Sequence, residues 1–368
     1  MNIRPFVLGD VSGLNALRAE AAWAPLPVTH WQWHLRNPAQ EDSLIGWVID
    51  NDGSIDGFMG NFIQNYYRGT TRYRAATCHE IVVSPRARGG AKVIMRAFLD
   101  QPGVFVGSTL NANTLSAPVH RKLGLTPWPQ GTDALKLSWP LSPATLAMAR
   151  GLRQLSKKFP ILQDRLGERF VPERARHFNA EAVQWPANTV LISDLGDDSD
   201  FARFWQALLA DGRLVADRSP ALMRWRTDDP NLYAAPLIVG WQDDQGLCAY
   251  AMAQLSKMAT IDAPVLEIID LVALERAPEH AVPALVDALI KAGRAMGASK
   301  VRLHVLSETL KKQLGPKLVS ARIEGGWGHG HAHFNAPSEN YADWNPTPFD
   351  GCYSYNLRQP RFRTRASI

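Results

Sequence analysis

An internal repeat is the feature that most constrains how this chain can fold. Leu8–Asp10, followed by Ser12, recurs as Leu195–Asp197 followed by Ser199. Trp33 and Trp225 are each followed five residues later by a proline. Two further pairs keep similar spacing, Asp52 with Asp244 and Phe58 with Tyr250. Because order and spacing persist at an offset of about 190 residues, the repeat predicts two copies of one domain rather than chance matches of turn residues.

The length agrees with two copies. The chain has 368 residues, and domains typically contain roughly 100 to 200 residues. Hydrophobic residues make up 46% and charged residues 20% of the sequence, which is typical of globular proteins and excludes a mostly disordered or fibrous chain. The formal net charge of +5 permits an anionic ligand without requiring nucleic acid.

The cysteines and the chain start bear on the compartment. Cys78, Cys248 and Cys352 are far apart and odd in number, so we expect no disulfide scaffold and a reducing cytoplasm. The N-terminus is charged at once and lacks the apolar run of a signal peptide. No stretch is apolar over the length needed to span a bilayer. These features predict a cytoplasmic protein without a membrane span.

We predict a first domain at 1–140, a basic helical linker at 141–185, a second domain at 186–360 and a basic tail at 361–368. The linker has leucines at helical spacing and many basic residues, Arg150, Arg153, Lys157, Lys158, Arg165, Arg169, Arg174 and Arg176. This pattern predicts a helix with a solvated basic face. A contact with an anionic membrane surface or with RNA phosphates is the alternative.

Each copy alternates strand and helix patterns. In the first copy the pattern predicts a strand at 3–7, a helix at 12–22, a hairpin at 46–64, and then strands and helices at 77–83, 91–99, 104–109 and 115–123. Such alternation predicts a mixed α/β or α+β domain, in which a mixed central sheet is flanked by helices.

The loop after the strand at 77–83 has the composition of an anion cradle. Arg86, Arg88 and Lys92 supply positive charge, and Gly89 and Gly90 let backbone N–H groups approach a ligand closely. The loop leads into a helix, whose N-terminus favours anions. It lacks the G-x-x-x-x-G-K-[ST] and G-x-G-x-x-G patterns of nucleotide-binding loops. A turn with solvated arginines is the alternative for the loop taken alone.

Here the chain resembles the GNAT superfamily of acyl-CoA-dependent N-acyltransferases. Arg86–Ala91 fits that family's pyrophosphate loop, [QR]-x-x-G-x-[GA], and Val83–Ala91 fits the longer form V-x-P-x-x-R-G-x-[GA]. Asn113 followed by a helix ending in His120–Leu125 is similar to the family's next motif. With the opening Ile3–Pro5 and Asp10, these matches cover about residues 1 to 130 in family order.

The resemblance implies an acyl-CoA site between two splayed parallel strands, here 77–83 and 104–109. Backbone groups of the first strand would hold pantetheine and polarise the thioester, and loop amides would bind pyrophosphate. An amine would attack the thioester, with the oxyanion stabilised by a strand amide. The resemblance implies these residues for the acetyl-CoA or other acyl-CoA: Val82, Val83, Arg86, Arg88, Gly89, Gly90, Ala91, Lys92, Asn113 and Ser116.

The catalytic candidates depart from the family pattern. Where the family usually has a tyrosine, four residues before the motif glycine, this chain has His120. A histidine could protonate the leaving thiolate as imidazolium or through water, or could lie at the surface at the end of the helix. For the base, Glu80 and His79 are neighbours on a strand and are expected on opposite faces, so only one can face the amine. Glu80 could instead be a paired carboxylate, and the amine could lose its proton to water.

The second copy lacks the cradle. After the strand at 267–272 there is no glycine, Pro278 removes a donor, and Glu275 and Glu279 would repel phosphate. We therefore expect a second domain without its own cofactor, which completes the acceptor site or forms a homodimer.

Histidines and tryptophans offered further candidates. His329, His331 and His333 would share one strand face, but three successive same-face residues strain a zinc site. A polar face lining a cleft or an interface is preferred and no metal is predicted; two of the histidines with a distant third ligand are the alternative. Trp31, Trp33 and Trp225 are expected to anchor the core rather than stack on sugars.

Together these features predict an acyl-CoA-dependent N-acyltransferase, specific for acetyl or longer acyl groups, acting on a small-molecule amine. Nucleic acid is not favoured as a partner. One alternative is a Fem-like ligase that takes aminoacyl groups from tRNA, motivated by the basic linker. The other is a CoA-binding sensor without catalysis, motivated by the missing tyrosine.

Overall fold

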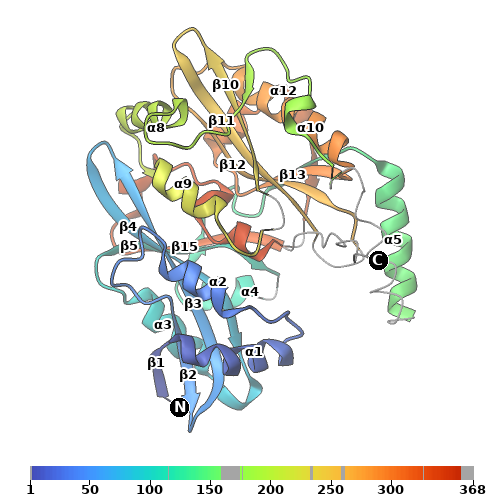
Figure 1. Cartoon of the computed structure of the whole chain (residues 1–368). Helices are drawn as coiled ribbons and strands as arrows, with labels where there is room; N and C mark the ends of the chain where they lie inside the picture. Colours follow the sequence, from blue (N-terminus) through green and yellow to red (C-terminus); the bar gives the residue numbers. More distant parts are fainter. Residues whose placement is uncertain are drawn as a thin grey trace.

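The computed structural model describes residues 2–114, 116–158, 175, 177–232, 235–257, 262–325 and 327–357. Strands in these ranges form two mixed sheets, one of eight strands and one of seven. Figure 1 shows the first sheet in the blue and cyan half of the molecule and the second in the yellow and orange half. Helices flank both sheets, so the predicted fold class is confirmed.

The first sheet has the strand order β1, β2, β3, β4, β5, β15 and β6. These strands are β1 (Asn2–Pro5), β2 (Gly46–Asn51), β3 (Ser54–Arg68), β4 (Thr71–Val83), β5 (Val104–Asn113), β15 (Trp327–Phe334) and β6 (Thr126–Pro127). Its helices are α1 (Val11–Glu20), α2 (Val28–Leu35), α3 (Gly90–Leu99) and α4 (Ser116–Lys122). Asp52 and Gly53 join β2 to β3 with φ values of 50° and 89°, as a two-residue hairpin turn requires.

The second sheet repeats this pattern with the order β8, β10, β11, β12, β13, β7 and β14. The strands are β8 (Thr189–Leu191), β10 (Leu237–Asp243), β11 (Gly246–Ser256), β12 (Val265–Ala273), β13 (Lys300–His304), β7 (Lys136–Pro140) and β14 (Arg322–Glu324). Its helices are α8 (Asp200–Ala210), α9 (Pro220–Thr227), α10 (Ala281–Met296), α11 (Glu308–Gln313) and α12 (Pro316–Ser320). In both sheets only the fourth and fifth strands pair in parallel, β4 with β5 and β12 with β13.

The two halves exchange strands. β7 comes from the first half of the chain but lies between β13 and β14 in the second sheet. β15 comes from the second half but lies between β5 and β6 in the first sheet. β9 (Val215–Ala216) also crosses over and pairs with β3. The predicted boundary at residue 140 therefore does not separate the sheets, because backbone pairing does not depend on which copy supplies a strand.

The repeated tryptophans meet at the contact between the two halves. The indole rings of Trp33 on α2 and Trp225 on α9 stack with centroids 4.3 Å apart and planes 5° apart. Each indole donates a hydrogen bond to the other residue's backbone carbonyl, at 2.9 Å and 3.0 Å. The pair is buried, so the prediction of core anchoring is confirmed. The reciprocal contact is what two copies related by an approximate two-fold axis would make.

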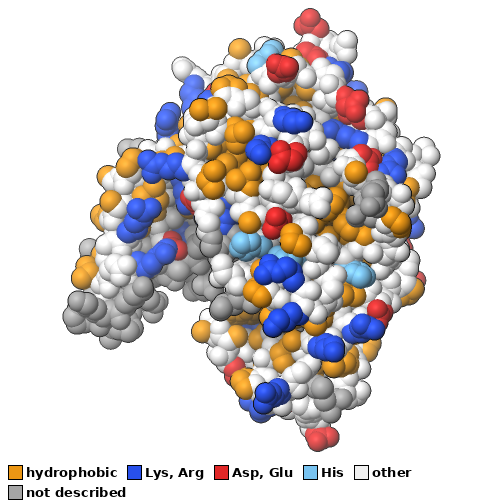
Figure 2. Space-filling view, turned by 180° about the vertical axis from the view of Figure 1, so that it is seen from behind, with side chains coloured by type: hydrophobic (Ala, Val, Ile, Leu, Met, Phe, Trp, Pro, Cys, Tyr) orange, Lys and Arg blue, Asp and Glu red, His pale blue; other side chains and the backbone are white. Residues whose placement is uncertain are grey.

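Helix α5 (Pro143–Lys158) leads out of β7 and stands apart from the sheets, at the right in Figure 1. Figure 2 shows lysine and arginine side chains along this arm. Arg150 is exposed, and Arg153 pairs with Asp262. The other basic residues predicted for the linker, Arg165, Arg169, Arg174 and Arg176, lie outside the described residues, as does the tail at 361–368. Among the helices described, none is long and apolar enough to cross a membrane.

Candidate acyl-CoA site

The pairing of β4 with β5 ends near the centre of the first sheet, and we call the stretch between the two strands beyond that point the gap. The two strands pair in parallel from Arg74 and Val104 up to Thr77 and Ser108. Beyond this point β4 continues to Val83 and β5 to Asn113 without pairing with each other. Unpaired strand edges in a protein interior need other hydrogen-bond partners, and a ligand with amide groups can supply them. The predicted splay of these strands is therefore present.

The loop at the mouth of the gap has the geometry of an anion cradle. Gly89 has φ of 87° and caps the N-terminus of α3, and a side chain there would meet open space. The first amides of a helix have no partners within the helix, which leaves the N–H groups of Gly90 and Ala91 available to an anion. Arg88 and Lys92 are exposed beside them and form no ion pair with any described residue. The predicted pyrophosphate residues are thus brought together.

Arg86 is used differently from its prediction. Its guanidinium pairs with Glu20 at 2.8 Å and with Asp56 at 3.0 Å. These hydrogen bonds raise the pKa of Arg86 above its usual value. The side chain therefore ties the loop to α1 and β3, and its charge is already shared with two carboxylates.

Asn113 and Ser116 form the start of α4 on the opposite side of the gap. The backbone N–H of Ser116 donates to Asn113 Oδ1 at 2.8 Å, and the N–H of Asn113 donates to Ser116 Oγ at 2.9 Å. These reciprocal bonds cap the helix. Asn113 and Ser116 therefore lie at the N-terminal end of α4, and their described hydrogen bonds stabilise the helix that carries His120.

A β-bulge in β4 corrects the predicted orientation of the two base candidates. Glu80 has φ of 52°, and the pairing of β3 with β4 shifts register between Phe58 and Gly60. A bulge interrupts the alternation of side chains between the faces of a sheet. His79 and Glu80 therefore lie on the same face, under α1 and α2, rather than on opposite faces.

Glu80 is a buried ion-paired carboxylate, the alternative that the sequence left open. Arg18 of α1 donates a hydrogen bond to it, and both side chains are nearly buried. Burial raises the pKa of Glu80 above its usual value, while Arg18 opposes that shift. A base held by a guanidinium is poorly placed to accept a proton from an amine. Sequence reasoning missed Arg18, because its partner lies 62 residues away.

His79 lies in a stack of aromatic rings. Its ring lies nearly parallel to that of His34, with centroids 5.3 Å apart and planes 10° apart. The ring of Trp31 is also nearly parallel to it, with centroids 6.4 Å apart. Burial lowers the pKa of His79 to about 3, so the ring is neutral at physiological pH. Its Nε2 atom is buried without a partner among the described residues.

His120 is buried at the inner face of α4. Its exposed fraction is 3%, which excludes the alternative of a surface histidine. Burial, and then the proximity of His331, lower its pKa to about 4. The ring of His331 on the exchanged strand β15 lies 6.0 Å away. At neutral pH His120 is therefore a neutral imidazole, which can donate one N–H in the manner of a tyrosine hydroxyl.

The three histidines of β15 lie in different surroundings. Bulges interrupt the pairing of β15 on either side of His329, His331 is buried, and His333 bonds to the carbonyl of Gly124 at 3.0 Å. In the part of the chain that is described, no group of His, Cys, Asp or Glu residues could hold a metal ion.

A segment near the C-terminus closes the inner end of the gap. Gly351 lies against Leu110 and Thr77, where an added Cβ would come within 3.1 Å of Leu110. Cys352 donates from Sγ to the carbonyl of Cys78 at 3.7 Å. No sequence pattern predicted this contact, because it joins residues 274 positions apart.

In the second sheet, buried ion pairs lie beside the corresponding end of the strand pairing. β12 and β13 pair only from Val265 to Glu267 on β12. Beyond that point Asp270 binds Arg218, which also binds Asp350 at 2.7 Å. The loop before α10 exposes Glu275 and Glu279, so no cradle for a phosphate stands at the mouth of this gap.

Comparisons with solved structures identify the fold. A GCN5-related N-acetyltransferase from Anabaena variabilis has a TM-score of 0.53 and 14% identity, covering 90% of this chain and 72% of that one. One from Kribbella flavida has a TM-score of 0.51 and 14% identity, covering 90% and 71%. A probable N-acyltransferase from Enterococcus faecalis has a TM-score of 0.52 and 10% identity, covering 90% and 72%.

At the level of sequence no such relation is found. No protein-family model matches the chain, and no curated protein sequence matches it. The structural likeness covers about nine tenths of the chain, and the gap and the cradle lie within its first half. The chain therefore has the fold of the GNAT superfamily, as its motifs predicted.

Proposed function

We propose that this protein is an acyl-CoA-dependent N-acyltransferase whose first sheet holds the acyl-CoA. The observation that carries the proposal is the gap between β4 and β5 with the Gly89 cradle at its mouth. Arg88, Lys92 and the amides at the start of α3 would hold the pyrophosphate. The unpaired edge of β4, including Val82 and Val83, would hold the pantetheine arm. The acyl-CoA supplies the activated acyl group as a thioester.

Different residues of the chain have separate roles in the proposed acyl transfer. Backbone amides of β4 at the bulge stabilise negative charge on the thioester oxygen, because they are fixed before the reaction begins. The neutral imidazole of His120 donates a hydrogen bond from its N–H to the departing sulfur, and the thiolate takes its proton from water. The acceptor is a small-molecule amine, and it loses its proton to water because Glu80 is held by Arg18. The second half supports this site through β15 and the segment around Gly351.

Two other functions remain distinguishable by experiment. A Fem-like ligase would use charged tRNA, and the basic arm α5 is the feature in its favour. A CoA sensor would bind the same ligand without turnover. We favour the transferase because His120 is a buried, neutral histidine at the position where the family usually has a tyrosine. We further propose a cytoplasmic location, no nucleic-acid partner, and a homodimer.

Calorimetric titration of acetyl-CoA tests the proposal. We expect one site per chain in the wild type and loss of binding in Gly89→Asp, which places a carboxylate in the cradle. The matched control is Gly53→Asp, since Gly53 has a similar φ of 89° and equally open surroundings in the β2–β3 turn. Release of CoA thiol with a panel of small amines then separates a transferase from a sensor. Absence of binding by the wild type would contradict the proposal and favour tRNA as the donor.

A further inference from the structure

The backbone at Glu80 has a strained conformation at the bulge of β4. Its φ of 52° lies in the left-handed region that residues other than glycine rarely adopt. Such conformations persist only where surrounding contacts hold them, and they cluster at active sites. Because the proposed function places the thioester at this bulge, the contacts that hold Glu80 bear on the acyl transfer.

The side chain of Glu80 is held by Arg18, in the last turn of α1. The guanidinium donates to the carboxylate, and the two side chains are 8% and 11% exposed. The guanidinium is itself fixed, because its Nε donates to the carbonyl of Ala24 at 2.8 Å and the ring of Trp23 lies 5.6 Å from it. A buried cation in a fixed place determines where the carboxylate can lie. Arg18 therefore anchors the residue whose backbone forms the bulge.

The same turn of α1 also reaches the cradle loop. Glu20 pairs with Arg86 at 2.8 Å and accepts a hydrogen bond from Ser84 Oγ at 3.3 Å. Arg18 and Glu20 thus bind β4 at its bulge and just beyond its end. The short segment between these contacts would lie along the pantetheine arm, so α1 holds both ends of that segment.

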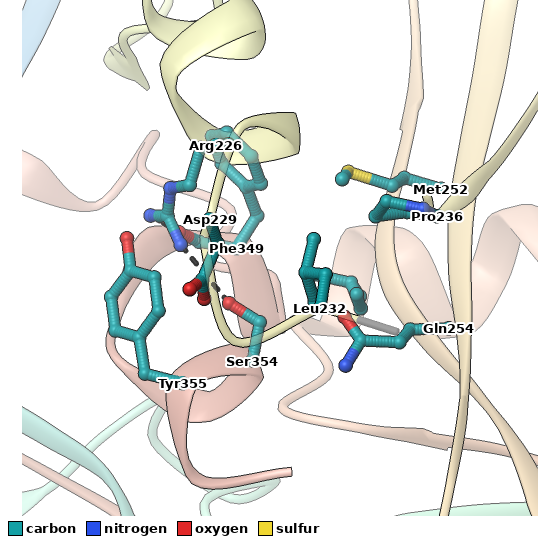
Figure 3. A pocket seen from close by; sticks show the side chains of 10 residues that line it. Arg226, Asp229, Leu232, Pro236, Met252, Gln254, Phe349, Ser354 and Tyr355 are labelled. Atoms are coloured by element: carbon teal, nitrogen blue, oxygen red, sulfur yellow. Dashed lines mark hydrogen bonds between the residues drawn. The ribbon is translucent and has the colours of Figure 1, made fainter. Parts of the chain in front are cut away.

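The second sheet has a bulge at the corresponding position but not the strained backbone. The pairing of β11 with β12 skips Ile269, and no residue of β12, all of which is described, has a positive φ. Asp270 is bound by Arg218 at 2.8 Å and also accepts the N–H of Leu271 at 3.1 Å. Arg226, which lines a small pocket together with Ile269, donates to a loop carbonyl at 2.8 Å (Figure 3). A bulge alone therefore does not impose a positive φ, and the strained form occurs in the half that has the cradle.

We propose that Arg18 is a positioning residue of the acyl transfer: its ion pair with Glu80 holds the left-handed bulge of β4, and the bulge directs backbone N–H groups at the thioester oxygen. This inference rests on the proposed function, which places the thioester there. Donors of this kind stabilise a transition state because they are fixed before the reaction begins. Loss of the ion pair should therefore slow the chemical step and leave the binding of acetyl-CoA unchanged.

Release of CoA thiol from acetyl-CoA, with the best acceptor of the amine panel, measures kcat, and calorimetry measures the Kd of acetyl-CoA. Arg18→Met should lower kcat by about tenfold or more without changing this Kd, because the cradle is untouched. Arg18→Lys, which keeps a cation, should retain more activity than Arg18→Met. The matched control is Arg4→Met, because Arg4 pairs with Asp10 at 2.8 Å at the other end of α1. It should lower stability and leave kcat unchanged.

Two double variants separate the backbone conformation from the charge. Arg18→Met/Glu80→Gly and Arg18→Met/Glu80→Ala both remove the carboxylate that Arg18→Met leaves buried without its partner. Glycine adopts a positive φ without steric cost, whereas alanine does not. The glycine variant should therefore have a kcat about fivefold or more above that of the alanine variant.

Three kinetic results would overturn the inference: an unchanged kcat in Arg18→Met, a parallel loss of kcat and of affinity for acetyl-CoA, or equal kcat in the two double variants. Crystal structures of the double variants give a readout without turnover. The φ at residue 80 should stay positive with glycine and become negative with alanine, and a positive φ with alanine would also overturn the inference. If no amine is acylated, the transferase proposal fails, while these φ values still decide whether the ion pair holds the bulge.

Discussion

The stacked pair of Trp33 and Trp225 should be a major source of stability, because it joins the two halves. Trp33 is 1% and Trp225 7% exposed. Truncation of a buried tryptophan to alanine costs about 3 to 5 kcal/mol, and the partner carbonyl also loses its donor. We therefore expect Trp33→Ala to lower the free energy of unfolding by about 4 to 5 kcal/mol. Trp33→Phe should cost about 1 to 2 kcal/mol, because the ring remains and the N–H is lost.

The coupling energy between Trp33 and Trp225 tests their contact more directly than either single substitution. Each indole bonds to a backbone carbonyl that survives the other substitution, so the two hydrogen bonds are additive. The stacking of the two rings, and the space that both rings fill, are lost in either single substitution, so these contributions are not additive. We therefore expect a coupling energy of about 1 kcal/mol between Trp33→Ala and Trp225→Ala.

Urea unfolding followed by fluorescence and by circular dichroism measures both quantities. Trp47→Ala is the control, because Trp47 is buried in the core of the first half, away from the contact, and should not couple with Trp225→Ala. Strict additivity of the Trp33 and Trp225 substitutions, or losses below about 1 kcal/mol, would refute the reasoning.

Three further predictions follow from the buried site. Burial lowers the pKa of His79 to about 3 and that of His120 to about 4, so the unfolded chain binds more protons. The free energy of unfolding should then be highest above pH about 6.5 and fall towards pH 4. In urea titrations at pH 4, His120→Gln should have a free energy of unfolding up to about 3 kcal/mol higher than the wild type. His333→Gln, at a partly exposed position, should change it little. His120→Ala should lower kcat by about 100-fold or more, while the Kd for acetyl-CoA measured by calorimetry stays unchanged. If kcat and the affinity for acetyl-CoA fall by the same factor, His120 has a structural role instead. Because Leu110 and the C-terminal segment close the gap, kcat/KM for acetyl-CoA should exceed that for octanoyl-CoA by about tenfold or more. Leu110→Ala should narrow this ratio and Leu303→Ala, a buried leucine of the second sheet, should not; an unchanged ratio in Leu110→Ala would contradict a closed gap.

Local chemistry made part of this structure predictable. The φ of 87° at Gly89 follows from a glycine between a strand and a helix. The turn at Asp52 and Gly53 follows from its residue types. The repeat identified Trp33 and Trp225 as equivalent positions, and it matches the equal strand orders of the two sheets.

The parts that sequence did not predict depend on contacts between distant residues. Nothing in the short strands β7 and β15 says which sheet they join, because either copy offers the same backbone edge. Alternation along β4 put His79 and Glu80 on opposite faces, and a single residue with positive φ changes that. The charge of Arg86 looked available in the sequence, but Glu20 and Asp56 meet it only in the folded chain.

The most direct test of the central proposal is a crystal structure of the protein with acetyl-CoA. We predict the pyrophosphate at the amides that follow Arg88 and the pantetheine arm between β4 and β5, with its thioester at the bulge of Glu80. Acetyl-CoA bound between β12 and β13, or outside the gap of the first sheet, would contradict the account.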